Sequence, residues 1–352
     1  MAESARLLTA PPRPRRGVAL SLFAACLAAC HGGLPPPAAL TLEGPALGTS
    51  YSVTVSQAAA SDGEALRAAV TRELEDVDSL MSTYRPDSEL SRLNRHRALD
   101  PFPLSEPTFS VLAAAREVSA VTGGAFDVTV GALVEAWGFG PRRAGPQPSP
   151  ETIERLRGEA GWRKLVLDAN GRYARKAAPA LQCDLSAIAK GYAADRVGAA
   201  LEAAGCADFL VDVGGELLAR GANPAGGPWR VGVERPDIAG RTAHRVLHVT
   251  DTAIATSGDY RNFREVGGRR LGHVLDPRAG RPAESLVASA TVLHSSAMLA
   301  DAFATALLVL GEEDGLELAE REDLAVLLIL RDGSGGLRDA ASSRFRARMN
   351  QE

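Results

Sequence analysis

Apolar residues recur every three or four positions in several long segments of the chain, and this spacing predicts amphipathic helices. The clearest such segment is 64–81, whose apolar positions share one helical face: Leu66, Val70, Leu74, Val77 and Met81. Segment 106–121 has the same character, with Ser105 placed to cap its start and two glycines after its end. Further helices are predicted at 151–159, 187–204 and 296–310.

Strand-length apolar or alternating runs lie between these helices. Segment 47–55 alternates polar and apolar residues, as a first strand would. The other predicted strands are 164–167, 209–213, 216–220, 229–234, 245–250, 286–293 and 324–330. Because strands and helices neither segregate nor strictly alternate, the pattern predicts a mixed α/β layered fold.

The predicted helix 187–204 carries a stripe of mostly small residues: Ala189, Ala193, Val197, Ala200 and Ala204. Such a stripe lets a neighbouring element approach closely. Segment 142–150, rich in proline and glycine, is expected to be a surface loop.

The N-terminal segment departs from this globular pattern. Three arginines, Arg13, Arg15 and Arg16, precede an apolar run at 18–29 that is too short to span a bilayer as a helix. A basic head, a short apolar middle and small residues before a cut are typical of a secretory signal. The run ends in Leu-Ala-Ala-Cys30, which resembles the bacterial lipoprotein cleavage box and predicts lipidation of Cys30. An ordinary signal peptide with an incidental cysteine is the alternative.

The expected organisation is a lipoprotein signal at 1–30, a Pro/Gly/Ala linker at 31–45, one catalytic domain at 46–333 and a loose polar tail at 334–352. Removing the residues before Cys30 removes four arginines and one glutamate, a net +3, so the formal charge falls from −4 to −7. An acidic surface argues against nucleic acid and against nonspecific adhesion to anionic lipid. Cys183 and Cys206 lack metal-ligand spacing, which favours two buried thiols over a metal site. In an oxidising compartment the two thiols could instead form a disulfide.

The first candidate site segment is DLSAIAKGY, from Asp184 to Tyr192. Asp184 and Ser186 precede a helix and are placed to cap its free amides. Lys190 lies one turn further on, where its ammonium would reach a phosphate or an adenine edge. The small residues around it, Ala187, Ala189 and Gly191, leave room for a ligand. The alternative is a solvated lysine on an ordinary capped helix.

Two other segments add polar groups. Gly214 and Gly215 join two strand-like runs, as a hairpin turn or as a phosphate-facing turn, and these two interpretations are compatible. Asp301 and Thr305 lie four apart on a helix and so project from one face. A carboxylate and a hydroxyl are hard oxygen ligands that favour magnesium over zinc, although such a pair is often incidental.

The segment GHVLDPRAG contributes His273 and Arg278. Asp276 before a proline, with Gly280 closing, is typical of a turn. A histidine and an arginine at a strand end would supply a proton acceptor and a phosphate clamp. The alternative is a hydrogen-bonded histidine with a structural role.

Eight collinear segments together resemble the ApbE family, the FAD:protein FMN transferases. They are LGTSYSV, MSTYRPDSELSRLN, TGGAFDVTVGALVEAWGFG, DLSAIAKGYAADR, DVGGE, ATSGDYRN, GHVLDPRAG and ADAFATALLVLG, and they extend from about residue 47 to 330. The resemblance implies a two-lobed, T-fold-like α/β architecture with FAD in the cleft between the lobes. It also implies magnesium-dependent cleavage of the FAD diphosphate, transfer of FMN to a Thr or Ser hydroxyl of a partner protein, and release of AMP.

The resemblance assigns roles to individual residues. It places Leu47, Tyr84, Ala125, Phe126, Asp127, Asp184, Lys190 and Ile254 around FAD. Magnesium is expected at the main chain of Ala187 and at Asp301 and Thr305, and His273 is expected to be the catalytic base, with Arg278 beside it. Ala304 stands where some members carry a second metal-binding carboxylate, and Leu47 replaces a methionine.

Two other activities use the same residues. One is a magnesium-dependent FAD pyrophosphatase that releases free FMN and AMP, and the other is a lipoprotein that binds FAD without turnover. The chain shows no convincing acceptor motif of its own. The expected acceptor is therefore another exported or membrane redox protein, and the expected location is the periplasmic face of the inner or outer membrane, with no nucleic-acid partner.

Overall fold

A computed structural model describes residues 39–57, 62–141, 147–236, 242–260, 263–266, 269–332 and 336–350, with the backbone alone at 264–266 and 269–270. Cys30, the predicted signal and most of the predicted linker lie outside these ranges. Within them, no helix combines the length and the apolar character needed to cross a bilayer.

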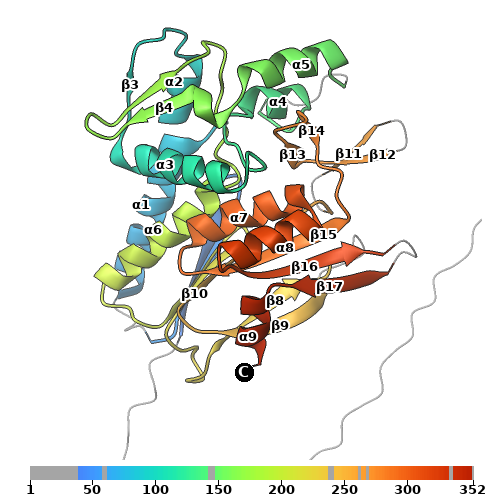
Figure 1. Ribbon diagram of the computed structural model, residues 1–352. Helices are drawn as coiled ribbons and strands as arrows, with labels where there is room; N and C mark the ends of the chain where they lie inside the picture. Colours follow the sequence, from blue (N-terminus) through green and yellow to red (C-terminus); the bar gives the residue numbers. More distant parts are fainter. Residues whose placement is uncertain are drawn as a thin grey trace, which may run out of the picture. The chain divides into compact units, whose positions relative to one another are not determined.

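An eight-stranded antiparallel sheet forms the centre of the fold (Figure 1). Its strands, in spatial order, are β1 (Leu40–Ala46), β2 (Thr49–Val55), β6 (Phe209–Val213), β7 (Glu216–Arg220), β10 (Thr252–Gly258), β15 (Val287–His294), β16 (Ala325–Arg331) and β17 (Leu337–Ala341). Strands β15 and β16 are buried at nearly every position, so both of their faces are covered. This explains why they read in the sequence as continuous apolar runs rather than alternating ones.

Helices cover one face of this sheet (Figure 1). They are α1 (Gly63–Met81), α6 (Ala189–Ala203), α7 (Ala297–Leu310) and α8 (Glu312–Arg321). Of the small-residue stripe predicted on α6, Ala189, Ala193 and Val197 are buried, whereas Ala200 is half-buried and Ala204 is exposed. The close contact of α6 with α7 is made by Gly191, which is not part of that stripe. A Cβ atom at Gly191 would lie 2.1 Å from the carbonyl oxygen of Ala297. Only a glycine therefore permits this approach of the two helices.

A second apolar cluster lies on the other face of the sheet. It contains the hairpin of β8 (Trp229–Glu234) and β9 (Ala243–Val249), together with α9 (Ser343–Met349). Trp229, Val231 and Leu247 of the hairpin pack with Leu327 and Phe345. The sheet is thus the middle layer of the fold.

The remaining elements form a smaller region above the helix layer in Figure 1. It comprises α2 (Glu89–Arg95), β3 (Phe102–Pro103), α3 (Glu106–Val121), α4 (Gly131–Ala136), α5 (Pro150–Glu159), the 3₁₀ helix η2 (Trp162–Lys164), β4 (Leu165–Asp168), β5 (Tyr173–Lys176), β11 (Phe263–Val266), β12 (Arg269–Gly272), β13 (Leu275–Asp276) and β14 (Arg281–Pro282). A third cluster, with Leu133, Ile153 and Leu275, joins α4 and α5 to β13. The indole of Trp137 donates to the carbonyl of Gly280 at 2.9 Å, which fixes the turn between β13 and β14.

The predicted mixed α/β fold is confirmed, with two corrections to its ends. Residues 40–45, predicted as part of the linker, belong to β1 with Ala46, because pairing with β2 satisfies their backbone groups. Residues after 333 were expected to be loose, yet 337–341 extend the sheet as β17 and 343–349 form α9. Phe345 of α9 is only 2% exposed, and its burial holds the polar helix against the sheet.

Candidate functional site

A cleft of about 1750 Å³ lies among the main sheet, the helix layer and the smaller region. All the residues predicted for the site line it except Arg278. These lining residues are Leu47, Tyr84, Ala125, Phe126, Asp127, Asp184, Ala187, Lys190, Ile254, His273, Asp301 and Thr305. They come from turns, strands and helices that are distant in sequence, so the tertiary fold brings them together.

Lys190, on the first turn of α6, lies between two buried carboxylates. Its Nζ atom is 3.1 Å from Oε1 of Glu216 and 3.6 Å from Oδ2 of Asp301. The backbone N–H of Gly191 donates to the same Oδ2 atom at 3.1 Å. Glu216 is 5% exposed and Asp301 2% exposed, so water screens this cluster weakly.

Lys190, Glu216 and Asp301 shift one another's pKa values. Burial would lower the pKa of Lys190, but Asp301 and Glu216 outweigh burial, so the net shift is upward and the ammonium stays charged. Burial raises the pKa of Glu216 to about 8 and that of Asp301 above its usual value, because the opposing effect of the Lys190 ammonium is smaller. Among the residues that the structure describes, the buried Oε2 atom of Glu216 has no hydrogen-bond partner. Two carboxyl groups thus share one ammonium, and a further cation beside them would favour the ionised form of both.

The donor atoms near Asp301 suit a hard cation. Thr305 lies one turn beyond Asp301 on α7, and its hydroxyl contacts the Ser257 hydroxyl at 3.0 Å. In the part of the chain that the structure describes, no group of three or more His, Cys, Asp or Glu side chains could hold a metal ion. A divalent ion here would therefore depend on hydroxyl and carbonyl oxygens and on oxygens from a ligand. That combination is typical of magnesium, which keeps water and phosphate ligands.

Two tight turns face the cleft. The predicted glycine turn is confirmed, because Gly214 (φ +67°) and Gly215 (φ +103°) connect β6 to β7. Leu47 and Gly48 connect β1 to β2 with φ of +50° and +73°. A two-residue hairpin turn of this kind needs positive φ at both positions, which is strained for leucine. The pairing of β1 with β2 holds Leu47 in this conformation at the edge of the cleft.

Asp127 uses both carboxylate oxygens to hold its own loop. Oδ1 accepts from the backbone N–H and the hydroxyl of Thr129 at 2.8 and 2.6 Å, and Oδ2 accepts from the N–H of Trp162 at 2.8 Å. Burial raises the pKa of Asp127, and these bonds oppose the rise. The loop holds the buried residues Ala125 and Phe126 at the cleft wall.

Asp184 forms a local turn before α6. Its Oδ1 atom accepts from the backbone N–H of Ser186 at 2.8 Å, whereas the helix begins at Ala189. Asp184 thus caps the turn that contains Ala187 rather than the helix itself. Asn94 fixes the residue before it, since its amide exchanges two hydrogen bonds with the backbone of Cys183, at 2.8 and 2.7 Å. Cys183 and Cys206 are free cysteines.

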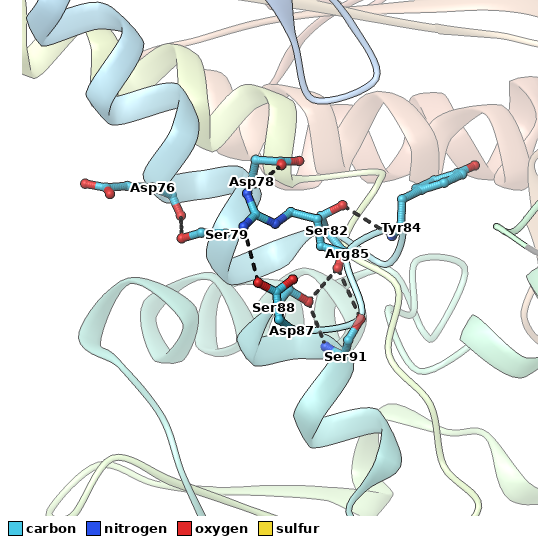
Figure 2. A network of polar contacts seen from close by, with 9 residues as sticks. All are labelled: Asp76, Asp78, Ser79, Ser82, Tyr84, Arg85, Asp87, Ser88 and Ser91. Atoms are coloured by element: carbon cyan, nitrogen blue, oxygen red, sulfur yellow. Dashed lines mark hydrogen bonds and ion pairs between the residues drawn. The ribbon is translucent and has the colours of Figure 1, made fainter.

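A polar network holds the turn that presents Tyr84 (Figure 2). The N–H of Tyr84 donates to the Ser82 hydroxyl at 3.2 Å, and the Ser88 hydroxyl donates to the Ser82 carbonyl at 2.6 Å. Arg85 connects this turn to Asp78 of α1 and to Asp87, each at 3.4 Å. The Tyr84 side chain points away from the network and is 63% exposed. An exposed aromatic ring on a fixed turn is suited to stacking on a planar ligand.

His273 and Arg278 are placed differently. His273 follows β12, lines the cleft, and packs edge-on against Phe139 with ring centroids 6.4 Å apart. Arg278 does not line the cleft. Its guanidinium binds Asp276 of the same turn through two hydrogen bonds of 3.0 Å. The structure therefore does not bring Arg278 to the other predicted residues.

Two residues of the site, Glu216 and Ser257, lie in the sequence motifs, but the sequence predicts no role for them. Glu216 follows the glycine turn, and Ser257 lies on β10 opposite Thr305. The only sequence signal for Glu216 is its place after two glycines that bring the backbone close to a ligand. Its contact with Lys190 depends on the packing of β7 against α6, which periodicity does not show.

The chain is similar to known proteins over most of its length. The family model described as the ApbE family matches residues 47–328. The FAD:protein FMN transferase of Vibrio cholerae is 41% identical over 322 residues, which cover 91% of this chain and 95% of that protein. That of Escherichia coli K12 is 39% identical over 295 residues, which cover 83% and 84%.

The fold is also similar to those of solved ApbE structures. The flavin transferase ApbE from Vibrio cholerae superposes with a TM-score of 0.81 at 39% identity, covering 88% of this chain and 98% of that one. The apo form of the Pseudomonas stutzeri flavinyl transferase ApbE also gives a TM-score of 0.81, at 37% identity and with 90% and 98% coverage. This chain therefore belongs to the ApbE family.

Proposed function

We propose that this protein transfers the FMN half of FAD to a Thr or Ser hydroxyl of a partner protein and releases AMP. The observation that carries the proposal is the convergence of Lys190, Asp301, Thr305 and His273 in one cleft beside an exposed aromatic ring. The Lys190 ammonium, together with oxygen ligands for a cation, suits a diphosphate, and a histidine suits proton removal. The names of the relatives as FAD:protein FMN transferases support the same activity.

The reaction is a phosphoryl transfer to an oxygen. The acceptor oxygen attacks the FMN phosphorus, and a new P–O bond forms as the bond from that phosphorus to the bridging oxygen breaks. AMP leaves with the bridging oxygen, and the hydroxyl proton goes to the imidazole of His273. Proton removal is needed because a neutral hydroxyl is a weak nucleophile. Lys190 binds the diphosphate and offsets charge that develops on the leaving phosphate.

We infer that magnesium is held by the Asp301 carboxylate, the Thr305 hydroxyl and the main-chain carbonyl of Ala187. Oε2 of Glu216 is buried with no hydrogen-bond partner among the described residues, and two carboxyl groups share the Lys190 ammonium, and both observations support a cation in this region. When bound, magnesium would neutralise the diphosphate and make its phosphorus more susceptible to attack. Ala304 offers no second carboxylate beside Asp301, so the ion would keep more water ligands.

We further propose that the mature protein is anchored by a lipid on Cys30 at the periplasmic face of the inner or outer membrane. An exported or membrane redox protein is then the acceptor. The basic head, the short apolar run and the Leu-Ala-Ala-Cys sequence support this proposal. Mass spectrometry of the N-terminal peptide tests it, because an unmodified Cys30 would contradict lipidation.

The test of the activity is incubation of the purified protein with FAD, magnesium and an exported redox domain that carries a Thr acceptor. Flavin fluorescence on the denatured acceptor is the expected result. Free FMN and AMP with an unlabelled acceptor would instead identify a pyrophosphatase. Unchanged FAD would identify a binding protein without turnover.

A further inference from the structure

Asp195 of α6 caps the N-terminus of α7, the helix that carries Asp301 and Thr305. Its Oδ2 atom accepts from the Ser296 hydroxyl at 2.7 Å and from the N–H of Met298 at 3.0 Å. Its Oδ1 atom accepts from the N–H of Ala297 at 2.8 Å. The first N–H groups of a helix have no partner within the helix, and a carboxylate there also interacts favourably with the helix dipole.

The same two helices meet again inside the cleft. Gly191 of α6 donates its backbone N–H to Asp301, and Lys190 lies 3.6 Å from the same oxygen. Between these contacts and Asp195, the backbones of α6 and α7 are in direct contact. The space between Gly191 and the Ala297 carbonyl is too small for a Cβ atom. α6 therefore contacts α7 at two places along α7. These are the N-terminus of α7, through Asp195 and Gly191, and Asp301, through Gly191 and Lys190.

We infer that Asp195 is a positioning residue for the transfer site. Asp195 does not line the cleft. It fixes the N-terminus of α7 against α6, and this sets where Asp301 and Thr305 lie relative to Lys190. The inference rests on the proposed function, because it concerns the diphosphate and cation site. Small displacements of groups that hold a reacting phosphate cost large factors in rate.

A simple helix cap would affect stability alone, whereas a positioning residue also affects cation binding. Asp195→Asn keeps the size of the side chain but replaces one acceptor oxygen by an NH₂ group, which faces donors of α7. We expect this variant to bind Mn²⁺ about 10–100-fold more weakly, the range found when residues behind metal ligands are changed. Dinucleotide binding without a cation should be unchanged.

Glu73→Gln on α1 provides a matched control, because its partner Arg196 lies on the same helix as Asp195. Arg196, next to Asp195, binds Glu73 of α1 at 2.6 and 2.8 Å, so this ion pair holds α6 to α1 and does not involve α7. Both variants should unfold at a lower temperature than the wild type. Only Asp195→Asn should lose Mn²⁺ affinity.

The measurement uses the full chain with a FAD analogue in which a methylene replaces the bridging oxygen of the diphosphate. Mn²⁺ binding is followed by electron paramagnetic resonance, and analogue binding in EDTA by flavin fluorescence. Unchanged Mn²⁺ affinity in Asp195→Asn, or an equal loss in Glu73→Gln, would overturn the inference. If Asp195→Asn does not fold, Ser296→Ala removes one of the three donors and should give a smaller loss of the same kind.

This design separates the inference from the proposed function, since neither binding measurement requires turnover. A wild-type protein that binds Mn²⁺ and the analogue but transfers no FMN would refute the transferase activity. The Mn²⁺ affinities of Asp195→Asn and Glu73→Gln would then still decide the role of Asp195. A wild type that binds no Mn²⁺ would refute both.

Discussion

At the scale of single residues, Glu216 shows how a buried charge can serve a site. It is the carboxylate nearest the Lys190 ammonium, and it keeps that ammonium from depending on Asp301 alone. If Asp301 is to bind a cation, the ammonium must have another partner. A buried ion pair adds little stability compared with apolar packing, so a functional reason for Glu216 is favoured.

Glu216→Gln should raise the magnesium concentration needed for half-maximal activity by about 10-fold. The amide keeps the shape but removes the charge, so Lys190 competes with the cation for Asp301. Binding of FAD in EDTA should not weaken, because the change removes a negative charge beside the diphosphate. A titration of FMN transfer with magnesium gives the answer, and an unchanged or lower midpoint would contradict this role.

His273→Ala should abolish FMN transfer and leave FAD binding nearly intact. A general base contributes about 10²–10⁴-fold to a rate, and no other imidazole lines the cleft among the described residues. Single-turnover transfer and flavin fluorescence quenching measure the two effects separately. If FAD binding is lost together with transfer, His273 holds the cleft structurally, through its packing on Phe139.

At the scale of elements, the contact between α6 and α7 depends on Gly191. Gly191→Ala would place a Cβ atom 2.1 Å from the Ala297 carbonyl, and backbone atoms cannot move as cheaply as a side-chain end. We expect a loss of about 3 kcal/mol in the free energy of unfolding. Gly158, exposed in α5 with no neighbour within 4 Å of its Cβ position, is the control.

Gly158→Ala should leave stability unchanged or raise it by up to about 1 kcal/mol, because alanine favours a helix. Urea unfolding of both variants measures the difference. Similar losses in the two would mean that backbone freedom, and not the approach of α6 to α7, explains the effect.

His294 should make the start of α7 sensitive to acid. Burial lowers its pKa from 6.5, an effect to which Arg344 and Arg348 add and which the Asp195 carboxylate opposes. Its Nδ1 atom accepts the N–H of Ser296 at 3.0 Å, so the neutral ring is required. Because the unfolded chain binds the proton more tightly, stability is full above about pH 6.5 and falls as pH drops toward the lowered pKa.

His294→Asn keeps an acceptor near the Nδ1 position and does not titrate. We expect the wild type to lose more stability than this variant between pH 7.5 and 5.5, as measured by urea unfolding at both values. Asp301 and Glu216 titrate in both proteins, so the difference isolates His294. Equal losses would contradict the assignment.

Local patterns predicted elements well where the signal lies within the element. The bounds of α3 match the prediction, because Ser105 caps its start, the helical apolar positions continue to Val118, and glycines follow. The prediction missed β1 and α9, whose stability comes from partners elsewhere in the chain. In the site, the residues that line the cleft were predicted, yet the pairing of Arg278 with Asp276 and the contact of Asp195 with α7 depend on side-chain geometry.

At the scale of the whole molecule, the C-terminal residues complete the second face of the sheet. β17 pairs with β16 from Leu327 to Arg331, and the Ser342 hydroxyl donates to the Leu324 carbonyl at 2.6 Å and accepts from the N–H of Val326 at 2.9 Å. Phe345 then enters the apolar cluster beneath β8 and β9. Strand pairing, the Phe345 ring and the Ser342 hydroxyl thus all hold this polar segment to the sheet.

Ending the chain after residue 333 should therefore produce a protein that aggregates. The truncation uncovers the edge of β16, whose residues from Leu327 to Leu330 are apolar, and a long apolar edge strand pairs readily with other chains. Phe345→Ala alone should lower the free energy of unfolding by about 3–5 kcal/mol, because it leaves a cavity in a closed cluster. Size-exclusion chromatography and urea unfolding measure the two effects, and a chain ended after Asn350 is the control. If the chain ended after residue 333 stays monomeric and as stable as this control, the C-terminal segment is not part of the folding unit.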